Sequence, residues 1–271
     1  MISSISNILG YLLNFIYNII NNYGFAIIIF SILIKIVLLP LSIKQQKTMK
    51  KSAKMQMELK ELQDKYKNNP EKLNQEMMNL YKKENMSPFS GCLSSIVQII
   101  LLFAVFYLVR SPLTYMKKVD TQIIENYKTE ISTSSAYPEV QIIREKGNED
   151  SNVYLNMNFL GLDLSSIPNV NYKDYKVFII PILYVISSII SMKLSINMQG
   201  KKKEDKEKTE SDEMEAMQSM NRSMSYMMPI MAVSISFVAP LGLALYWLVN
   251  NILMIVERLS LDKILKEEEE A

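Results

Sequence analysis

Residues 24–43, GFAIIIFSILIKIVLLPLSI, form a run of twenty residues that carries a single charge, Lys35. A helix rises about 1.5 Å per residue, so this run spans about 30 Å, the thickness of a bilayer's hydrocarbon core. Uncharged apolar segments of similar character occupy residues 93–109, 177–192, 224–239 and 241–256. Five such segments leave too little amphipathic surface to cover them in water. The sequence therefore predicts an integral, all-α membrane protein, a bundle of five spans.

The last two apolar segments belong to one stretch, Tyr226 to Val256, which Pro240 and Gly242 interrupt. Proline next to glycine favours a turn, so residues 239–242 predict a tight connection between two spans. Four of the five spans have only 16–17 residues. Helices of that length measure about 25 Å, which predicts local thinning of the bilayer.

The composition removes several classes of enzyme. The chain has no histidine, one cysteine (Cys92) and 7 glycines among 271 residues. Histidine is the commonest general base and metal ligand, and a single cysteine excludes both an internal disulfide and a Cys-rich zinc site. No glycine-rich phosphate-binding motif is present. The sequence predicts a protein that is not an enzyme and that uses no cofactor or metal.

Basic residues cluster beside particular spans. Residues 44–88 hold 11 Lys against 6 acidic residues, further Lys and Arg lie in 193–223, and residues 1–23 hold none. By the positive-inside rule, 44–88 and 193–223 lie in the cytoplasm together with the tail, 257–271, and loop 110–176 lies outside. The prediction is a multi-pass protein of the cell membrane with its N-terminus outside and its C-terminus in the cytoplasm.

Two of the segments outside the spans have helical patterns of their own. In 44–88, apolar residues recur at helical spacing on either side of Asn69-Pro70, an N-cap followed by a first-turn proline. This predicts an antiparallel two-helix cytoplasmic hairpin, whose lysines suit anionic lipids or RNA-bearing partners. Residues 1–23 are apolar with asparagines along one face, which predicts an interfacial helix; a sixth span or an uncleaved signal is the alternative.

These patterns give one order of segments along the chain. It runs through the interfacial helix (1–23), first span (24–43), hairpin (44–88), second span (89–109), extracytoplasmic loop (110–176), third span (177–192), cytoplasmic loop (193–223), fourth span (224–239), fifth span (240–256) and cytoplasmic tail (257–271).

Lys35 is the one residue within a span whose charge needs an explanation. A charged side chain at such depth costs at least a few kcal/mol on insertion scales. The other spans hold no Asp, Glu or Arg to pair with it. The sequence therefore predicts that Lys35 faces a water-containing cavity or the acidic groups of a substrate; snorkelling to the headgroups is the alternative. Gln98 and Ser191 are among the neutral polar residues of other spans that are candidates to line the same groove.

Three strings carry a resemblance to a known family. They are GFAIIIFSILIKIVLLPLSIKQQKTMKK at 24–51, LKELQDKYKNNPEKLNQEMMNLYKKENMSPFSGCL at 59–93, and PLGLALYWLVNNILMIVE at 240–257. Together they resemble the YidC/Oxa/Alb membrane protein insertases, of the bacterial, Gram-positive type. The resemblance covers residues from about 5 to 258, in the family's order.

The resemblance implies five core spans, a cytoplasmic hairpin, and a groove that is open to cytoplasm and lipid but closed outside. Where this chain has Lys35, the family usually has Arg, which implies that Lys35 attracts acidic groups of a nascent membrane protein; lysine lacks the bidentate fork. Gln98 matches a polar position of the second span, and Trp247 an aromatic position near the substrate path. The family usually has Pro where Ser94 stands, which predicts a straighter second span here.

The candidate residues form two sets. The substrate groove is expected to contain Lys35, Ser31, Gln98, Ser191 and Trp247, and the recruitment hairpin Lys50, Lys51, Lys54, Lys60, Lys65, Lys82 and Lys83. The expected partners are nascent membrane proteins, the ribosome or its targeting machinery, a Sec-type translocon and anionic lipids. Two other functions stay open: a chaperone for assembly of membrane complexes, and a small transporter, which normally needs intramembrane acidic residues or His.

Overall fold

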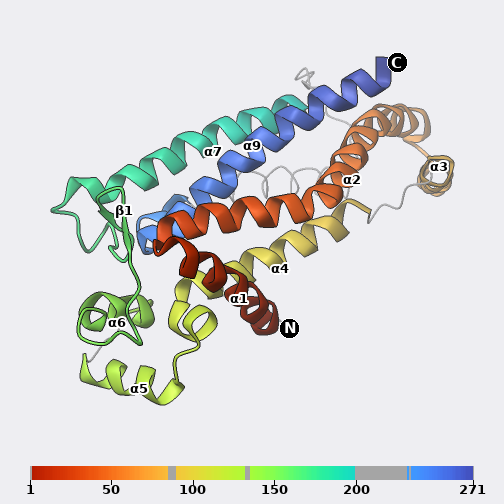
Figure 1. Ribbon diagram of the computed structural model, residues 1–271. Helices are drawn as coiled ribbons and strands as arrows, with labels where there is room; N and C mark the ends of the chain where they lie inside the picture. The colour runs from red at the N-terminus through yellow and green to blue at the C-terminus, as the bar shows by residue number, and fades with distance from the viewer. Residues whose placement is uncertain (1, 85–89, 132–134, 199–230, 232, 271) are drawn as a thin grey trace.

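The computed structural model describes residues 2–84, 90–131, 135–198, 231 and 233–270, and most of them are helical (Figure 1). The elements are α1 (Ile2–Ile20), α2 (Tyr23–Tyr66), α3 (Pro70–Lys83), α4 (Ser90–Arg110), the π-helical turn η1 (Leu113–Lys117), α5 (Thr121–Glu130), α6 (Pro138–Lys146), β1 (Asn158–Phe159), β2 (Leu162–Asp163), the 3₁₀ turn η2 (Tyr175–Phe178), α7 (Ile179–Met198) and α9 (Leu241–Glu270).

Among the residues that the structure describes, three helices are long and apolar enough to cross a membrane. They run over Tyr23–Thr48, Tyr175–Leu194 and Leu241–Ile264, and α4 adds a shorter apolar stretch, Val97–Arg110. This confirms a mostly helical membrane protein. The predicted fourth span, 224–239, lies for the most part outside the described residues. Residues 237–240 form the turn that precedes α9.

The helices are longer than the third and fifth predicted spans of 16 residues. The structure gives 20 residues to the third and 24 to the fifth, so each is at least about 30 Å long. The short lengths predicted for these two spans are therefore wrong, and these two helices give no support to a thinned bilayer. The difference arises because the apolar runs end at the first charged residues, Lys193 and Glu257, whereas the helices continue through them.

Helix α2 joins the first span and the first arm of the hairpin in one helix of 44 residues. Figure 1 shows it changing direction along its length, and Pro40 inside it removes one intrahelical hydrogen bond, a usual cause of a bend. Asn69 caps α3 by accepting from the Lys72 amide, and Pro70 occupies the first turn. Met55 of α2 and Leu80 of α3 are buried. We call the end of the bundle that carries α3 the hairpin end.

Helix α1 packs against α2, α4 and η1. Gly10 allows this approach, because a Cβ atom there would lie 1.8 Å from the backbone oxygen of Tyr115. The Ser6 hydroxyl donates to the Ala104 carbonyl oxygen of α4 at 2.9 Å. The opposite side of α1 exposes four apolar side chains at helical spacing, Ile8, Tyr11, Phe15 and Ile19.

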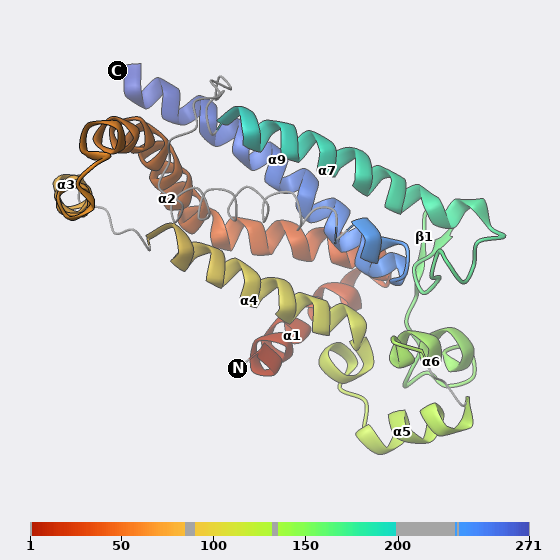
Figure 2. The same ribbon diagram turned by 180° about the vertical axis from the view of Figure 1, so that it is seen from behind.

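The segment between α4 and α7 lies at the end of the bundle opposite to α3, which Figures 1 and 2 both show; we call it the loop end. This segment makes hydrogen bonds to the first residues of α2 and α9. The Tyr23 amide donates to Asn156 O at 3.0 Å, and the amides of Leu241 and Gly242 donate to Ser166 O and Leu164 O, each at 2.9 Å. Backbone groups left unpaired at these helix starts are thereby satisfied.

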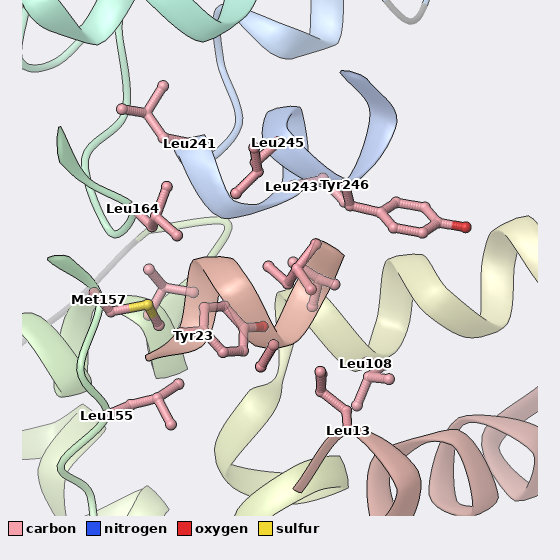
Figure 3. Packing of buried hydrophobic residues seen from close by; sticks show 14 of the residues in the cluster. Leu13, Tyr23, Leu108, Leu155, Met157, Leu164, Leu241, Leu243, Leu245 and Tyr246 are labelled. Atoms are coloured by element: carbon pink, nitrogen blue, oxygen red, sulfur yellow. The ribbon is translucent and has the colours of Figure 1, made fainter. Parts of the chain in front are cut away.

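Apolar side chains fill the loop end between these backbone contacts. Figure 3 shows Tyr23 between Leu155, Met157 and Leu164 of the loop and Leu13 and Leu108 of α1 and α4. All of them are buried and belong to one hydrophobic core. The loop segment therefore closes this end of the bundle with packed side chains.

The two-stranded hairpin β1–β2 contributes Phe159 to this closure. Its ring meets Phe25 of α2 edge to face with 5.1 Å between centroids and lies over Gly24, where a Cβ atom would come within 2.3 Å of it. The next two residues, Leu160 and Gly161, have φ values of 51° and 80°, which suits a two-residue hairpin turn. The turn leaves Leu160 exposed while Phe159 points inward.

A buried carboxylate ties the loop to the end of α4. Glu139, in the first turn of α6, is 5% exposed and accepts from the Thr114 hydroxyl at 2.7 Å and from the Thr114 amide at 3.0 Å. Burial raises the pKa of Glu139, an effect that the hydrogen bonds from Thr114 and the charge of Lys128 partly offset. Because desolvation is the largest cause, the folded protein binds a proton at Glu139 more readily than the unfolded chain.

We expect this group to give the loop end a pH-dependent stability. The pKa of the folded state lies above the ordinary Glu value of about 4.3, so stability falls as pH rises from that value through the folded pKa. The isosteric Glu139→Gln variant should lose this fall. Hydrogen exchange of the Thr114 amide region, compared between wild type and variant across this range, measures it, and parallel pH profiles would contradict it.

Candidate functional site

Lys35 forms an ion pair with Glu257 of α9. The Nζ atom lies 2.9 Å from Oε2, and the two side chains are 22% and 12% exposed. The expectation that Lys35 has no acidic partner is therefore wrong. The apolar run of the fifth span ends at Val256, one residue before Glu257, whereas α9 continues as a helix to Glu270.

The two residues meet because α2 and α9 start side by side at the loop end, where Gly242 lies against the Tyr23 ring. Lys35 comes twelve residues after the start of α2 and Glu257 sixteen after the start of α9. These positions lie about 18 Å and 24 Å along the two helices, a difference that two long side chains bridge. The pair thus sits within the apolar part of the bundle.

Glu257 is incompletely satisfied. Its Oε2 atom accepts from Lys35, but Oε1 is buried and has no hydrogen-bond partner among the described residues. A buried acceptor without a partner costs free energy. The carboxylate therefore retains an unused capacity to accept one more hydrogen bond.

Two further polar contacts join α2 and α9 closer to the hairpin end. The Gln46 amide donates to the Arg258 carbonyl oxygen at 3.4 Å, and Lys50 lies 3.7 Å from Asp262. Lys50, one of the predicted recruitment lysines, thus contacts α9 as well as belonging to the hairpin. Along this seam, basic groups of α2 face acidic groups of α9.

The other predicted groove residues lie at several places in the bundle. Ser31 is one helical turn from Lys35 on α2, but its buried hydroxyl donates within the helix, to Ile27 O at 2.7 Å. Gln98 of α4 is exposed and donates to Gln45 at 2.7 Å. Because Gln45 is ten residues beyond Lys35, Gln98 lies about 15 Å farther along α2 than Lys35. Among the described residues, no hydrogen bond, ion pair or ring contact joins any two of the five predicted groove residues.

Ser191 and Trp247 belong to the interface of α7 with α9. Both are buried, and the Trp247 and Tyr184 rings lie 6.1 Å apart. In the same interface, the Asn251 amide donates to the hydroxyls of Ser187 and Ser188 at 3.0 and 3.2 Å. These contacts hold α7 against α9 and place the polar atoms of this interface inside the bundle.

The lysines predicted to recruit substrate differ in their surroundings. Lys51 pairs with Glu84 at 3.3 Å, which links α2 to the end of α3. Lys65 lies 5.3 Å from the centre of the Tyr66 ring. Lys82 and Lys83 are exposed in the last turn of α3, where the helix dipole stabilises positive charge. The side chains of Lys54 and Lys60 lie outside the described residues.

The sequence missed Glu257, although one signal for it was present. Glu257 directly follows an apolar run, and a charged residue at a span end can reach back along the helix. Over the described residues, no three His, Cys, Asp or Glu side chains come together as a metal site would require. The arrangement offers a charge pair within an apolar bundle and a basic surface at the hairpin end.

Comparisons with known proteins all point to one family. The family described as 60Kd inner membrane protein matches residues 15–268. A protein from Treponema denticola described as membrane protein insertase YidC is 28% identical over 98% of this chain and 38% of its own length. Proteins of the same description are 30% identical in Chlorobaculum tepidum, over 93% of this chain and 35% of the relative, and in Fusobacterium nucleatum, over 92% and 91%. The chain thus spans little more than a third of the first two relatives and nearly all of the third.

Proposed function

The chain belongs to the 60Kd inner membrane protein family, the YidC/Oxa insertases, and from this premise we propose that it inserts nascent membrane proteins into the bilayer and helps them fold. The observation that carries the proposal is the family match over residues 15–268, joined to a charged residue, Lys35, deep in an apolar bundle. Insertion involves no covalent step. The protein offers the substrate's polar segment a less apolar path across the bilayer, and burial of the substrate's apolar surface in lipid drives the remainder of insertion.

We place the protein in the bacterial cell membrane as a five-span bundle, with the hairpin end in the cytoplasm and the loop end outside. The net positive charge of residues 44–88 supports this orientation. Helix α1 then lies at the outer surface. Its exposed Ile8, Tyr11, Phe15 and Ile19 would enter the boundary between headgroups and acyl chains.

The substrate path runs along α2 in this proposal. Lys35 draws the acidic groups of a short polar tail, and Ser31, Gln98, Ser191 and Trp247 are the further residues assigned to a groove open to cytoplasm and lipid. The packed loop end supports closure toward the outside, since apolar side chains and backbone hydrogen bonds fill it.

The hairpin receives the substrate near the ribosome or its targeting machinery, with anionic lipids as a second partner and a Sec-type translocon as a third. The exposed Lys65, Lys82 and Lys83 support this role, since a cluster of basic side chains attracts phosphate groups of lipid or RNA. Lys50, Lys51, Lys54 and Lys60 precede these residues in the sequence and belong to the same proposed recruiting set.

We expect recruitment to depend on the exposed lysines of α3. Replacing Lys82 and Lys83 with Gln should weaken binding of ribosome–nascent-chain complexes to proteoliposomes several-fold, and more strongly at low salt, because surface attraction is screened. The matched control replaces the exposed Lys173 and Lys176 at the loop end, which removes the same charge. Equal loss in both double variants would contradict a recruiting role for the hairpin.

Complementation tests the function as a whole. The chain is expressed in bacteria depleted of their own insertase, and translocation of the outer tail of a single-span reporter is followed by protease accessibility. We expect growth and tail translocation to return together. Growth without translocation would identify an assembly chaperone, and restoration of neither would contradict the proposal.

A further inference from the structure

Resting on the proposed function, we propose that Glu257 is a specificity-determining residue of the insertion site. Its carboxylate holds Lys35, so an acidic residue of a substrate must displace Glu257 before it pairs with Lys35. A neutral polar tail meets no such competition. Glu257 thereby reduces the preference for acidic tails that Lys35 alone would produce.

Glu257 already occupies the Lys35 ammonium group. Its Nζ atom donates to Glu257 Oε2 at 2.9 Å, a normal length for a charge-assisted hydrogen bond. The two side chains are only partly exposed, so water screens the pair less than it would at the surface. The pair is close to neutral in charge, and Lys35 does not act as an isolated cation.

One oxygen of the Glu257 carboxylate lacks a hydrogen-bond partner. Oε1 is buried and accepts no hydrogen bond from the described residues. A carboxylate with an unsatisfied buried oxygen is stabilised less in its place than one with both oxygens paired. An incoming carboxylate that pairs with Lys35 therefore competes with a partner that is not held at its full strength.

The other charged residues near the Lys35–Glu257 pair have different partners or positions. Along the seam of α2 with α9, Arg258 follows Glu257, and Lys50 faces Asp262 at 3.7 Å. Asp262 is farther along α9 and pairs with a lysine of its own. Glu257 is the acid in contact with Lys35, so the competition belongs to this position rather than to the acidic content of α9.

The test measures insertion of two substrates in one reaction. Proteoliposomes with the full chain receive an equimolar mixture of a single-span protein with an acidic tail and the same protein with its acidic residues changed to Asn and Gln. The readout is the ratio of protected acidic tails to protected neutral tails. Because both substrates meet the same protein molecules, the fraction of folded protein cancels.

We expect Glu257→Gln to raise this ratio by roughly fivefold, the factor that corresponds to about 1 kcal/mol for a partly exposed ion pair that no longer competes. The matched control, Asp262→Asn, removes the same charge from the same helix and should leave the ratio at its wild-type value. The double variant Lys35→Ala with Glu257→Gln should lose the rise, because the gain acts through Lys35.

Three results overturn parts of this account in distinguishable ways. An unchanged ratio in Glu257→Gln, with wild type inserting both substrates, overturns the role of Glu257 alone. An equal rise in Asp262→Asn overturns it too, since the effect would then be a general charge effect of α9. Insertion of neither substrate by wild type overturns the proposed function instead. Thermal unfolding of Glu257→Gln with and without the acidic substrate gives a second readout: the substrate should stabilise the variant more than the wild type.

Discussion

Replacing Lys35 with alanine is expected to slow insertion of a substrate with an acidic tail by about 10- to 100-fold. A hydrogen bond to a charged group contributes about 1.5–3 kcal/mol, which corresponds to one to two powers of ten. The loss also leaves Glu257, only 12% exposed, without its cation. An uncompensated carboxylate on the substrate path repels an acidic tail, which adds to the effect.

The measurement is the initial rate of tail protection in proteoliposomes. Lys35→Arg is the matched control, because it keeps the charge at the same position and should retain most of the rate. Insertion of the neutral-tailed substrate should fall much less, which separates lost attraction from lost folding. A wild-type rate for Lys35→Ala on the acidic substrate would contradict the electrostatic part of the mechanism.

The second large effect concerns the closed loop end. Phe159→Ala should lower the free energy of unfolding by about 3–5 kcal/mol, the usual range for truncating a buried Phe. The ring is 7% exposed, meets Phe25 edge to face and covers Gly24, so the substitution leaves a cavity where the loop segment rests on α2.

Unfolding in mixed micelles with increasing amounts of SDS measures this difference. The neighbouring Leu160 provides the control, because it is 77% exposed, and Leu160→Ala should change stability by less than about 0.5 kcal/mol. Similar losses in the two variants would show that Phe159 does not anchor the loop.

The mostly helical membrane fold follows from the sequence because it depends on local properties. Runs of apolar residues predict spanning helices, and Asn69-Pro70 predicts the start of α3, since capping is a contact within four residues. Helix lengths were less predictable. An apolar run ends at its first charge, but the helix continues past it, and this difference made the predicted third and fifth spans too short.

The candidate site was predictable only in part, because its contacts join distant residues. Lys35 was visible as an isolated charge, but its partner is 222 residues away, and no local pattern reveals such a contact. Phe159 lies in the long loop 110–176, and nothing local in the sequence marks it as an anchor. Its anchoring role depends on Gly24 and Phe25 of another element, which only the folded chain brings together.

Reconstitution shows whether the chain inserts membrane proteins by itself. The purified chain alone is placed in liposomes, and a single-span substrate with a short tail is added as it is synthesised. We expect the tail to become protected from external protease far above the level in empty liposomes, and protection to fall with Lys35→Ala. Protection no greater than in empty liposomes, with the chain shown to be folded and correctly oriented, would contradict it.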